Sequence, residues 1–194
     1  MNLLLREDAA DALPGLWGML HLPALPGSPA SRLPVDGALD QALGDAAILV
    51  EAGFSGLVVE NFGDRPFVAG AVDPVTVAAM TRIAATVKAT WPQLHLVINC
   101  LRNDARGALA IATASGADAI RVNVHCGAMA TDQGVLEGRA GDTLRTRRQW
   151  DAEGVRIFAD VAVKHAVPVA DRPLEVEASD LRYRGAADVL LVTG

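Results

Sequence analysis

The chain has 194 residues, of which 51% are hydrophobic and 4% aromatic, and its formal net charge is −6. This length suits one sizeable core, so we expect a single domain over residues 1–194. The negative charge argues against a nucleic-acid binder, because binding a phosphate backbone needs concentrated Lys and Arg. Two cysteines make no disulfide framework, and no apolar run approaches the roughly 18 residues of a membrane-spanning helix. The acidic N-terminus is unlike a secretory signal, so we expect a cytoplasmic protein.

Short apolar runs alternate along the chain with longer stretches of helical period. The runs predict strands at 15–22, 56–61, 94–101, 119–124, 155–165 and 188–194. The intervening stretches predict helices at 37–52, 74–90, 104–115, 141–152 and 174–184. Asp73 and Asp104 are suited to N-caps, and Gly116 to a helix stop. Residues 125–140 show no periodicity and are expected to form a long loop.

Runs that are apolar on both faces are typical of parallel strands covered on both sides. Six strands alternating with five helices predict βαβ units and a parallel sheet. An open doubly wound sheet is the alternative, but no G-x-G-x-x-G motif follows the first strand. We therefore predict an α/β fold, a TIM-type (β/α)8 barrel truncated to about six β/α units.

Polar residues gather where the predicted strands end. In a barrel these ends meet at one rim, where the active sites of this fold are built. Because side chains alternate along a strand, one parity predicts a set of residues that face the lumen. The set comprises His21, Glu60, Asn99, Arg121, Asn123, Asp160 and Lys164. The opposite parity on the fifth strand would turn His165 inward instead, and the sixth strand ends in Thr193.

Six motifs in order closely resemble the BtpA/SgcQ family. They are HLPALPGSP (21–29), VVENFGDRPF (58–67), NCLRND (99–104), IRVNVHCGAMATDQGVLEG (120–138), ADVAVKHA (159–166) and ADVLLVTG (187–194). The resemblance implies a TIM-type barrel related to the ribulose-phosphate-binding barrels. It also implies two contexts: biogenesis and stability of photosystem I as a peripheral thylakoid protein in cyanobacteria, and sugar uptake and metabolism for SgcQ-type members.

The resemblance also implies two more strands with their helices after Gly194. The chain is therefore either a fragment or a short protein whose first and sixth strands have unpaired edges, which favour pairing with another chain, as in a homo-oligomer. Phosphate-binding loops of such barrels commonly follow the seventh and eighth strands, so phosphate binding is not carried over.

The candidate catalytic residues are His21, Glu60, Asp160 and Lys164. His21 and Glu60 on neighbouring strands are suited to acid/base work, or to a purely structural hydrogen bond. Lys164 near Asp160 could form an imine or transfer protons, or the two could form an ion pair that only neutralises the mouth. We expect Cys100 and Cys126 to be small buried hydrophobes.

The remaining rim positions are expected to bind substrate. They are Asn61, Asp64, Asn99, Asn103, Arg121, Asn123 and His165. No metal site is assigned: His21, Glu60, Asp160 and His165 offer suitable donors, but no tight ligand spacing supports one. No cofactor is predicted.

Two functions remain open from the sequence. One is a part in membrane-complex biogenesis, with peripheral membrane association, and this function rests on the resemblance. The sequence itself predicts no transmembrane segment. The other is a lyase, aldolase or isomerase that acts on a small, sugar-like and perhaps phosphorylated ligand. A weaker alternative is a binding module that has lost its activity.

Overall fold

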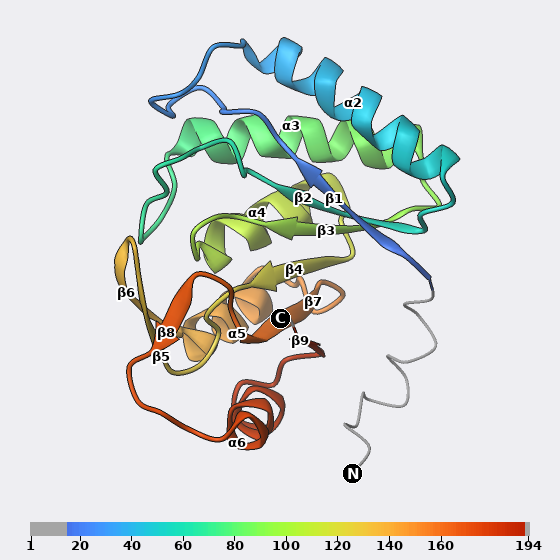
Figure 1. Ribbon diagram of the computed structural model, residues 1–194. Coiled ribbons are helices and arrows are strands. Elements are labelled where there is room, and N and C mark those ends of the chain that lie inside the picture. Colours follow the sequence, from blue (N-terminus) through green and yellow to red (C-terminus); the bar gives the residue numbers. More distant parts are fainter. Residues whose placement is uncertain (1–14, 193–194) are drawn as a thin grey trace.

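The protein is described by a computed structural model that covers residues 15–192. Six parallel strands form one curled sheet in the order β1-β2-β3-β4-β7-β9, so β1 and β9 are its edges (Figure 1). The strands are β1 (Trp17–His21), β2 (Gly56–Glu60), β3 (His95–Asn99), β4 (Ala119–Val122), β7 (Arg156–Ala162) and β9 (Val189–Val192). The predicted parallel pairing is confirmed, and within residues 15–192 β1 and β9 each have one neighbour in this sheet.

Helices connect successive strands and cover the outer face of the sheet. They are α2 (Val35–Glu51), α3 (Pro74–Thr90), α4 (Ala105–Ser115), α5 (Ala140–Gln149), α6 (Leu174–Ser179) and the π-helical turn η1 (Asp180–Arg184). The predicted caps are confirmed, since Asp73 accepts a hydrogen bond from Val75 N and Asp104 accepts one from Gly107 N. Gly116 ends α4 with φ 74°, a conformation that glycine adopts without strain.

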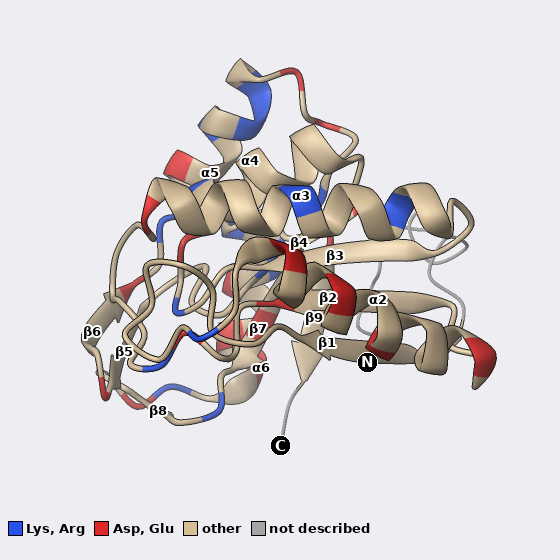
Figure 2. Ribbon diagram, turned by 90° about the horizontal axis from the view of Figure 1, so that it is seen from above, with Lys and Arg blue, Asp and Glu red and all other residues tan. Residues whose placement is uncertain are grey.

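Two separate apolar layers lie on the two faces of the sheet. The outer layer, between strands and helices, contains large buried side chains such as Leu57, Ile98 and Met80. The inner layer, in the lumen, is smaller and includes Val97 and Phe158. Charged residues of both signs are spread over the molecule, whereas most of the ribbon of the central strands is uncharged (Figure 2).

Two aspartates that precede strands tie neighbouring β/α units together in the same way. Asp118, just before β4, accepts a hydrogen bond from Leu96 N of β3 at 2.8 Å, and Asp188, just before β9, accepts one from Ile157 N of β7 at 2.8 Å. Each carboxylate also contacts a basic side chain of a covering helix. These carboxylates fix the register of the sheet at the end opposite the rim.

The segment that follows β4 differs from its prediction. Instead of a long loop it forms a hairpin of β5 (Ala128–Thr131) and β6 (Gly134–Glu137), and β8 (Ala166–Pro168) adds to it as a third antiparallel strand. This small sheet stands at the rim end of the main sheet (Figure 1). It has an apolar core of its own around Met129 and Leu136. The loop prediction was wrong because these strands are too short for alternation to show.

Candidate functional site

The lumen-facing parity predicted for the first four strands is confirmed. His21, Glu60, Asn99 and Arg121 are register partners in turn across β1, β2, β3 and β4. Their side chains therefore stand in one row at the carboxyl ends of the strands. Asp160 continues the row on β7 through its contact with Arg121.

His21 and Glu60 form a contact pair at the ends of β1 and β2. His21 Nε2 lies 3.1 Å from Glu60 Oε2, and 45% of the His21 side chain is exposed against 8% for Glu60. Burial raises the pKa of Glu60 above its ordinary 4.5, although Arg121, His21 and Arg102 oppose the shift. A carboxyl with a raised pKa beside a half-exposed imidazole can exchange protons with a ligand on one side and with water on the other.

An aromatic stack supports the imidazole. The ring of Phe62 lies parallel to that of His21 at 4.3 Å between centroids, and the Arg65 guanidinium lies 4.8 Å from the Phe62 centroid. The loop bearing Phe62 packs directly on the loop after β1, because a Cβ on Gly63 would lie 2.2 Å from Ala24 N. Only glycine permits this close approach, which keeps the Phe62 ring in contact with His21 at the rim.

Asn61 and Asp64 hold these loops together instead of facing the lumen. Asn61 Oδ1 accepts from Leu101 N at 2.7 Å, and its Nδ2 donates to Asp64 at 3.1 Å. Asp64 also accepts from Leu25 N at 2.7 Å. Both residues therefore act at the site through the loops that they position.

A directional hydrogen-bond network crosses the mouth from β3 to β7. Asp160, whose side chain is fully buried, accepts two hydrogen bonds of 3.0 Å from Arg121 and one of 2.8 Å from Asn123 Nδ2. Because Asn123 turns its Nδ2 to the carboxylate, its Oδ1 accepts from Asn99 Nδ2 at 3.2 Å. The Oδ1 of Asn99 is then buried and has no hydrogen-bond partner among residues 15–192. A buried acceptor of this kind is costly unless a ligand or water donates to it.

The fifth strand departs from prediction beyond Asp160. A register shift between Asp160 and Ala162 interrupts the alternation, and β7 ends at Ala162. Lys164 and His165 consequently lie exposed in the turn to β8, and His165 has φ 61°. The predicted Lys164–Asp160 ion pair was wrong, since Arg121 and Asn123 occupy the carboxylate.

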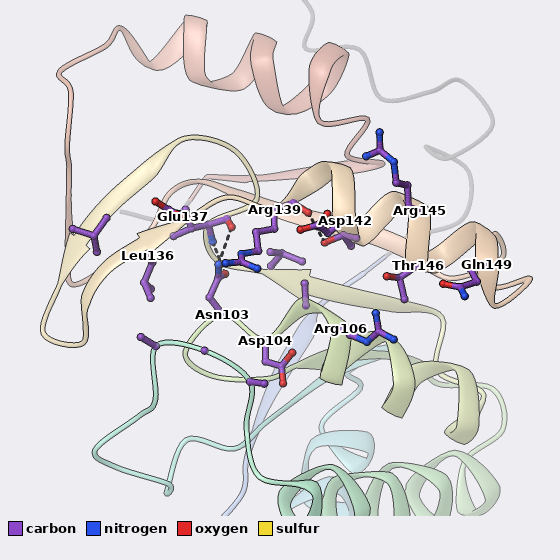
Figure 3. Close-up of a pocket in the computed structure, with 18 residues that line it drawn as sticks. Asn103, Asp104, Arg106, Leu136, Glu137, Arg139, Asp142, Arg145, Thr146 and Gln149 are labelled. Carbon is purple, nitrogen blue, oxygen red and sulfur yellow. Dashed lines mark hydrogen bonds between the residues drawn. The ribbon is translucent and has the colours of Figure 1, made fainter.

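Asn103 lies at a different place from the other predicted ligands. Its side chain exchanges two hydrogen bonds of 2.9 Å with the backbone of Val124, outside the lumen. It lines a cavity of about 520 Å³ between α4, α5 and the β5–β6 hairpin (Figure 3). Arg106, Arg139, Asp142 and Glu137 also line it, so both charge signs are present and the chemistry of a ligand is not specified.

Arg102 is the rim residue that sequence reasoning missed. It follows β3, is 8% exposed, and donates from Nη2 to the carbonyl oxygen of Lys164 at 2.7 Å. It lies within the motif NCLRND, and the signal that could have identified it is a basic residue three positions after the last residue of a strand, Asn99. Its burial depends on the loop path after β3, which no local pattern predicts.

His125 and the two cysteines lie behind the mouth. His125 Nε2 donates to Gly185 O at 2.9 Å, and burial lowers the pKa of its imidazole. Burial also raises the thiol pKa of Cys100 and, less strongly, of Cys126, so both thiols favour their protonated form. Cys100 is the buried small hydrophobe that we predicted, whereas Cys126 is only half-buried.

Residues 15–192 contain neither a cluster of metal ligands nor a helix suited to cross a membrane. Over residues 15–192 no three His, Cys, Asp or Glu side chains are grouped as metal ligands would be. No helix in that part of the chain combines the length and apolar character needed to span a bilayer.

Known proteins similar to this chain were compared with it in sequence and in structure. Photosystem I biogenesis protein BtpA of Synechocystis is 43% identical over 177 residues, which are 91% of this chain and 61% of that protein. An uncharacterized protein of Methanocaldococcus jannaschii is also 43% identical, over 92% of this chain and 67% of its own length. The chain thus spans about three fifths of the cyanobacterial relative.

The fold and the family follow from two further comparisons. The crystal structure of 7,8-dihydropteroate synthase from Vibrio fischeri superimposes with a TM-score of 0.55 at 16% identity, over 92% of this chain and 61% of that one. This likeness confirms the TIM-type barrel fold, here with six of its strands. The model of the BtpA family matches residues 14–194. The chain therefore belongs to the BtpA family.

Proposed function

We propose that this protein is an enzyme that transfers a proton on a small hydroxylated carbonyl compound, as an isomerase or lyase does. The observation that carries the proposal is the His21–Glu60 contact of 3.1 Å, at the rim where this fold builds its active sites. In the proposed reaction the Glu60 carboxylate takes the proton from the carbon beside the carbonyl group. His21 then exchanges that proton with water, because its imidazole is half exposed.

The surroundings of the pair support a catalytic role for Glu60. Its raised pKa brings it nearer to neutral pH, where a general base is most effective. The fixed network of Asn99, Asn123 and Asp160 beside it supplies a prearranged polar surface for a substrate. An imine mechanism is left out of the proposal, because Lys164 is exposed in a turn.

Deuterium exchange tests the proposal without knowledge of the natural substrate. The protein is incubated in D2O with a panel of hydroxyaldehydes and hydroxyketones, free and phosphorylated, and incorporation at the carbon beside the carbonyl group is followed by NMR. We expect exchange above the buffer rate for at least one compound, and a loss of about 10²–10⁴-fold in Glu60→Gln. Glu51→Gln at the exposed end of α2 is the matched control. Exchange that is equal in the Glu60 variant and the native protein would refute the role of Glu60.

A second function is favoured by one specific observation, the name of the Synechocystis relative. We propose as the alternative that the protein takes part in the biogenesis of a membrane complex of the photosystem I type. The archaeal relative of equal identity carries no such role in its name, so a chemical activity shared by both is the more economical proposal. Flotation with vesicles of anionic and neutral lipids tests the alternative: recovery in the lipid fraction would support it, and recovery only in the lipid-free fraction would count against it.

A further inference from the structure

We infer that Arg102 is the anion anchor of the barrel mouth, and that the ligand held there is a small hydroxylated molecule carrying an oxyanion, either a carboxylate or a phosphate. The inference deepens the proposed function and rests on the same small-molecule site. It assigns the oxyanion to the loop after β3, the third strand of the main sheet. Complete eight-stranded barrels of this type commonly bind phosphate after the seventh and eighth strands of the barrel, which are not β7 and β8 here.

The path of the Arg102 side chain places its charge over the mouth. Arg102 follows β3, and its Nη2 donates at 2.7 Å to the carbonyl oxygen of Lys164, which follows β7. In the sheet β4 lies between these two strands, so the side chain crosses above the carboxyl end of β4. Its positive charge opposes the burial that raises the pKa of the Glu60 carboxyl on β2.

Two guanidinium groups, of Arg102 and Arg121, and two carboxylates, of Glu60 and Asp160, balance one another at the mouth, but Arg102 contacts no carboxylate within residues 15–192. The Asp160 carboxylate accepts a bidentate pair of hydrogen bonds from the Arg121 guanidinium. Glu60 is buried and contacts His21. Within residues 15–192 no carboxylate forms an ion pair with Arg102, although this residue is only 8% exposed. A buried guanidinium is ordinarily paired, since desolvation of an isolated charge is costly.

The donors of Arg102 remain available for such a partner. A guanidinium has five N–H donors, and the neighbouring carbonyl of Lys164 takes only one of its nitrogens. None of the other Arg102 nitrogens is an enclosed atom that lacks a partner. These nitrogens are therefore not fully enclosed, and the planar fork to which they belong suits a carboxylate or phosphate.

The second observation specifies the rest of the ligand. Asn99 Oδ1 is buried and receives no hydrogen bond from the part of the chain that the structure describes, and the hydrogen bonds of Asn123 and Asp160 fix the orientation of its amide. This acceptor would be satisfied by an O–H or N–H group of a ligand bound beside Glu60, which is the register partner of Asn99. Because Asn99 Oδ1 is enclosed, a ligand hydroxyl reaches it only if neighbouring side chains move. A hydroxyl group that enters there would donate to Asn99 within the row that holds Glu60, so a hydroxylated oxyanion would satisfy both Asn99 and Arg102.

Binding to the native full chain tests the inference with four probes, measured by isothermal titration calorimetry at low and high salt. The probes are inorganic phosphate, D-ribose, D-ribose 5-phosphate and D-gluconate. We expect the two hydroxylated anions to bind more tightly than D-ribose, and their order to distinguish phosphate from carboxylate as the preferred group. Arg102→Gln should weaken both anions at least tenfold and leave D-ribose unchanged.

Further variants separate the anion contact from folding. Arg102→Lys keeps a charge but loses the fork, so we expect it to fold like the native chain and to show an intermediate affinity. Asn99→Leu should weaken all three hydroxylated probes and leave inorganic phosphate unchanged. Arg145→Gln, exposed on α5, is the control with native affinities.

The outcomes distinguish this inference from the proposed function. Anion affinities that do not change in Arg102→Gln and Arg102→Lys would overturn the inference, as would native protein that binds none of the anions below about 10 mM, an affinity of only some 3 kcal/mol. Glu60-dependent deuterium exchange together with either result would leave the proposed function intact. Anion binding that depends on Arg102 without any exchange would sustain the anchor and refute the proton transfer.

Discussion

Breaking the buried ion pair of the mouth is expected to destabilise the protein far more than removing both of its charges. Arg121 contacts Asp160 through two hydrogen bonds of 3.0 Å, and their side chains are 16% and 0% exposed. Asp160→Leu leaves a mostly buried guanidinium alone, and Arg121→Met leaves a fully buried carboxylate with only Asn123 as its donor. Each single change should lower the free energy of unfolding by about 3–5 kcal/mol.

The double variant removes both charges and keeps apolar side chains of similar size. Replacement of a buried pair in this way is often nearly neutral, but Asn123 Nδ2 loses its acceptor, so we expect a loss of only about 1–3 kcal/mol. The two single losses should therefore exceed the double loss by at least about 3 kcal/mol, a coupling that distant residues do not show.

Urea unfolding followed by circular dichroism and by the fluorescence of the three tryptophans measures all four species. The control is Arg148→Met, which breaks an exposed contact with Glu153, where 82% of the arginine side chain is accessible; it should cost less than about 1 kcal/mol. Additive single losses of about 1 kcal/mol each would refute the reasoning, because they would show that water solvates the mouth network and that it is not a rigid, prearranged surface.

Two further predictions concern the loops and the pH dependence of stability. Gly63→Ala should lower the free energy of unfolding by at least about 1–3 kcal/mol in urea titrations, because its Cβ meets the backbone of Ala24, whereas Gly44→Ala on α2 meets nothing within 4 Å and should stabilise by about 0.5–1 kcal/mol; equal effects would contradict the close approach. Burial raises the pKa of Glu60 above 4.5, so the native state holds that proton more tightly and stability falls as the pH rises through the window above 4.5. The pKa of His125 lies below 6.5, so its contribution has the opposite sign and stability falls as the pH drops below 6.5. Urea midpoints measured between about pH 4 and pH 8 should lose the first slope in Glu60→Gln and the second in His125→Gln, and an unchanged profile in either variant would refute that assignment.

The regular part of the fold could be predicted because each element carries its own local signal. Apolar runs marked all six strands of the main sheet, and the caps Asp73 and Asp104 marked the starts of two helices within a residue. Alternation grouped the residues of the row on the first four strands, whereas the structure showed which face of each strand turns to the lumen. Such signals depend only on neighbouring residues, so they survive in a single sequence.

The failures share a different physical cause, which is dependence on distant contacts. The hairpin of β5 and β6 is stabilised by pairing with β8, more than thirty residues further along the chain. The register shift after Asp160 depends on how β9 pairs with β7. It turned Lys164 out of the predicted row, and no pattern within the segment 155–165 signals it.

The mouth network bears on two alternatives that the sequence left open, a structural network of mutually neutralised charges and a binding site, and it favours the proposed binding site. A purely structural network would be saturated throughout, since unpaired buried groups are costly. Here saturation is confined to the β7 end, where Asp160 accepts three hydrogen bonds. At the β3 end Asn99 Oδ1 has no hydrogen-bond partner among residues 15–192, and the fork of Arg102 has only the Lys164 carbonyl oxygen. The hydrogen bonds to Asp160 fix the orientation of Asn123, and Asn123 in turn fixes that of Asn99. A prearranged binding site requires polar groups that are oriented in this way before a ligand binds.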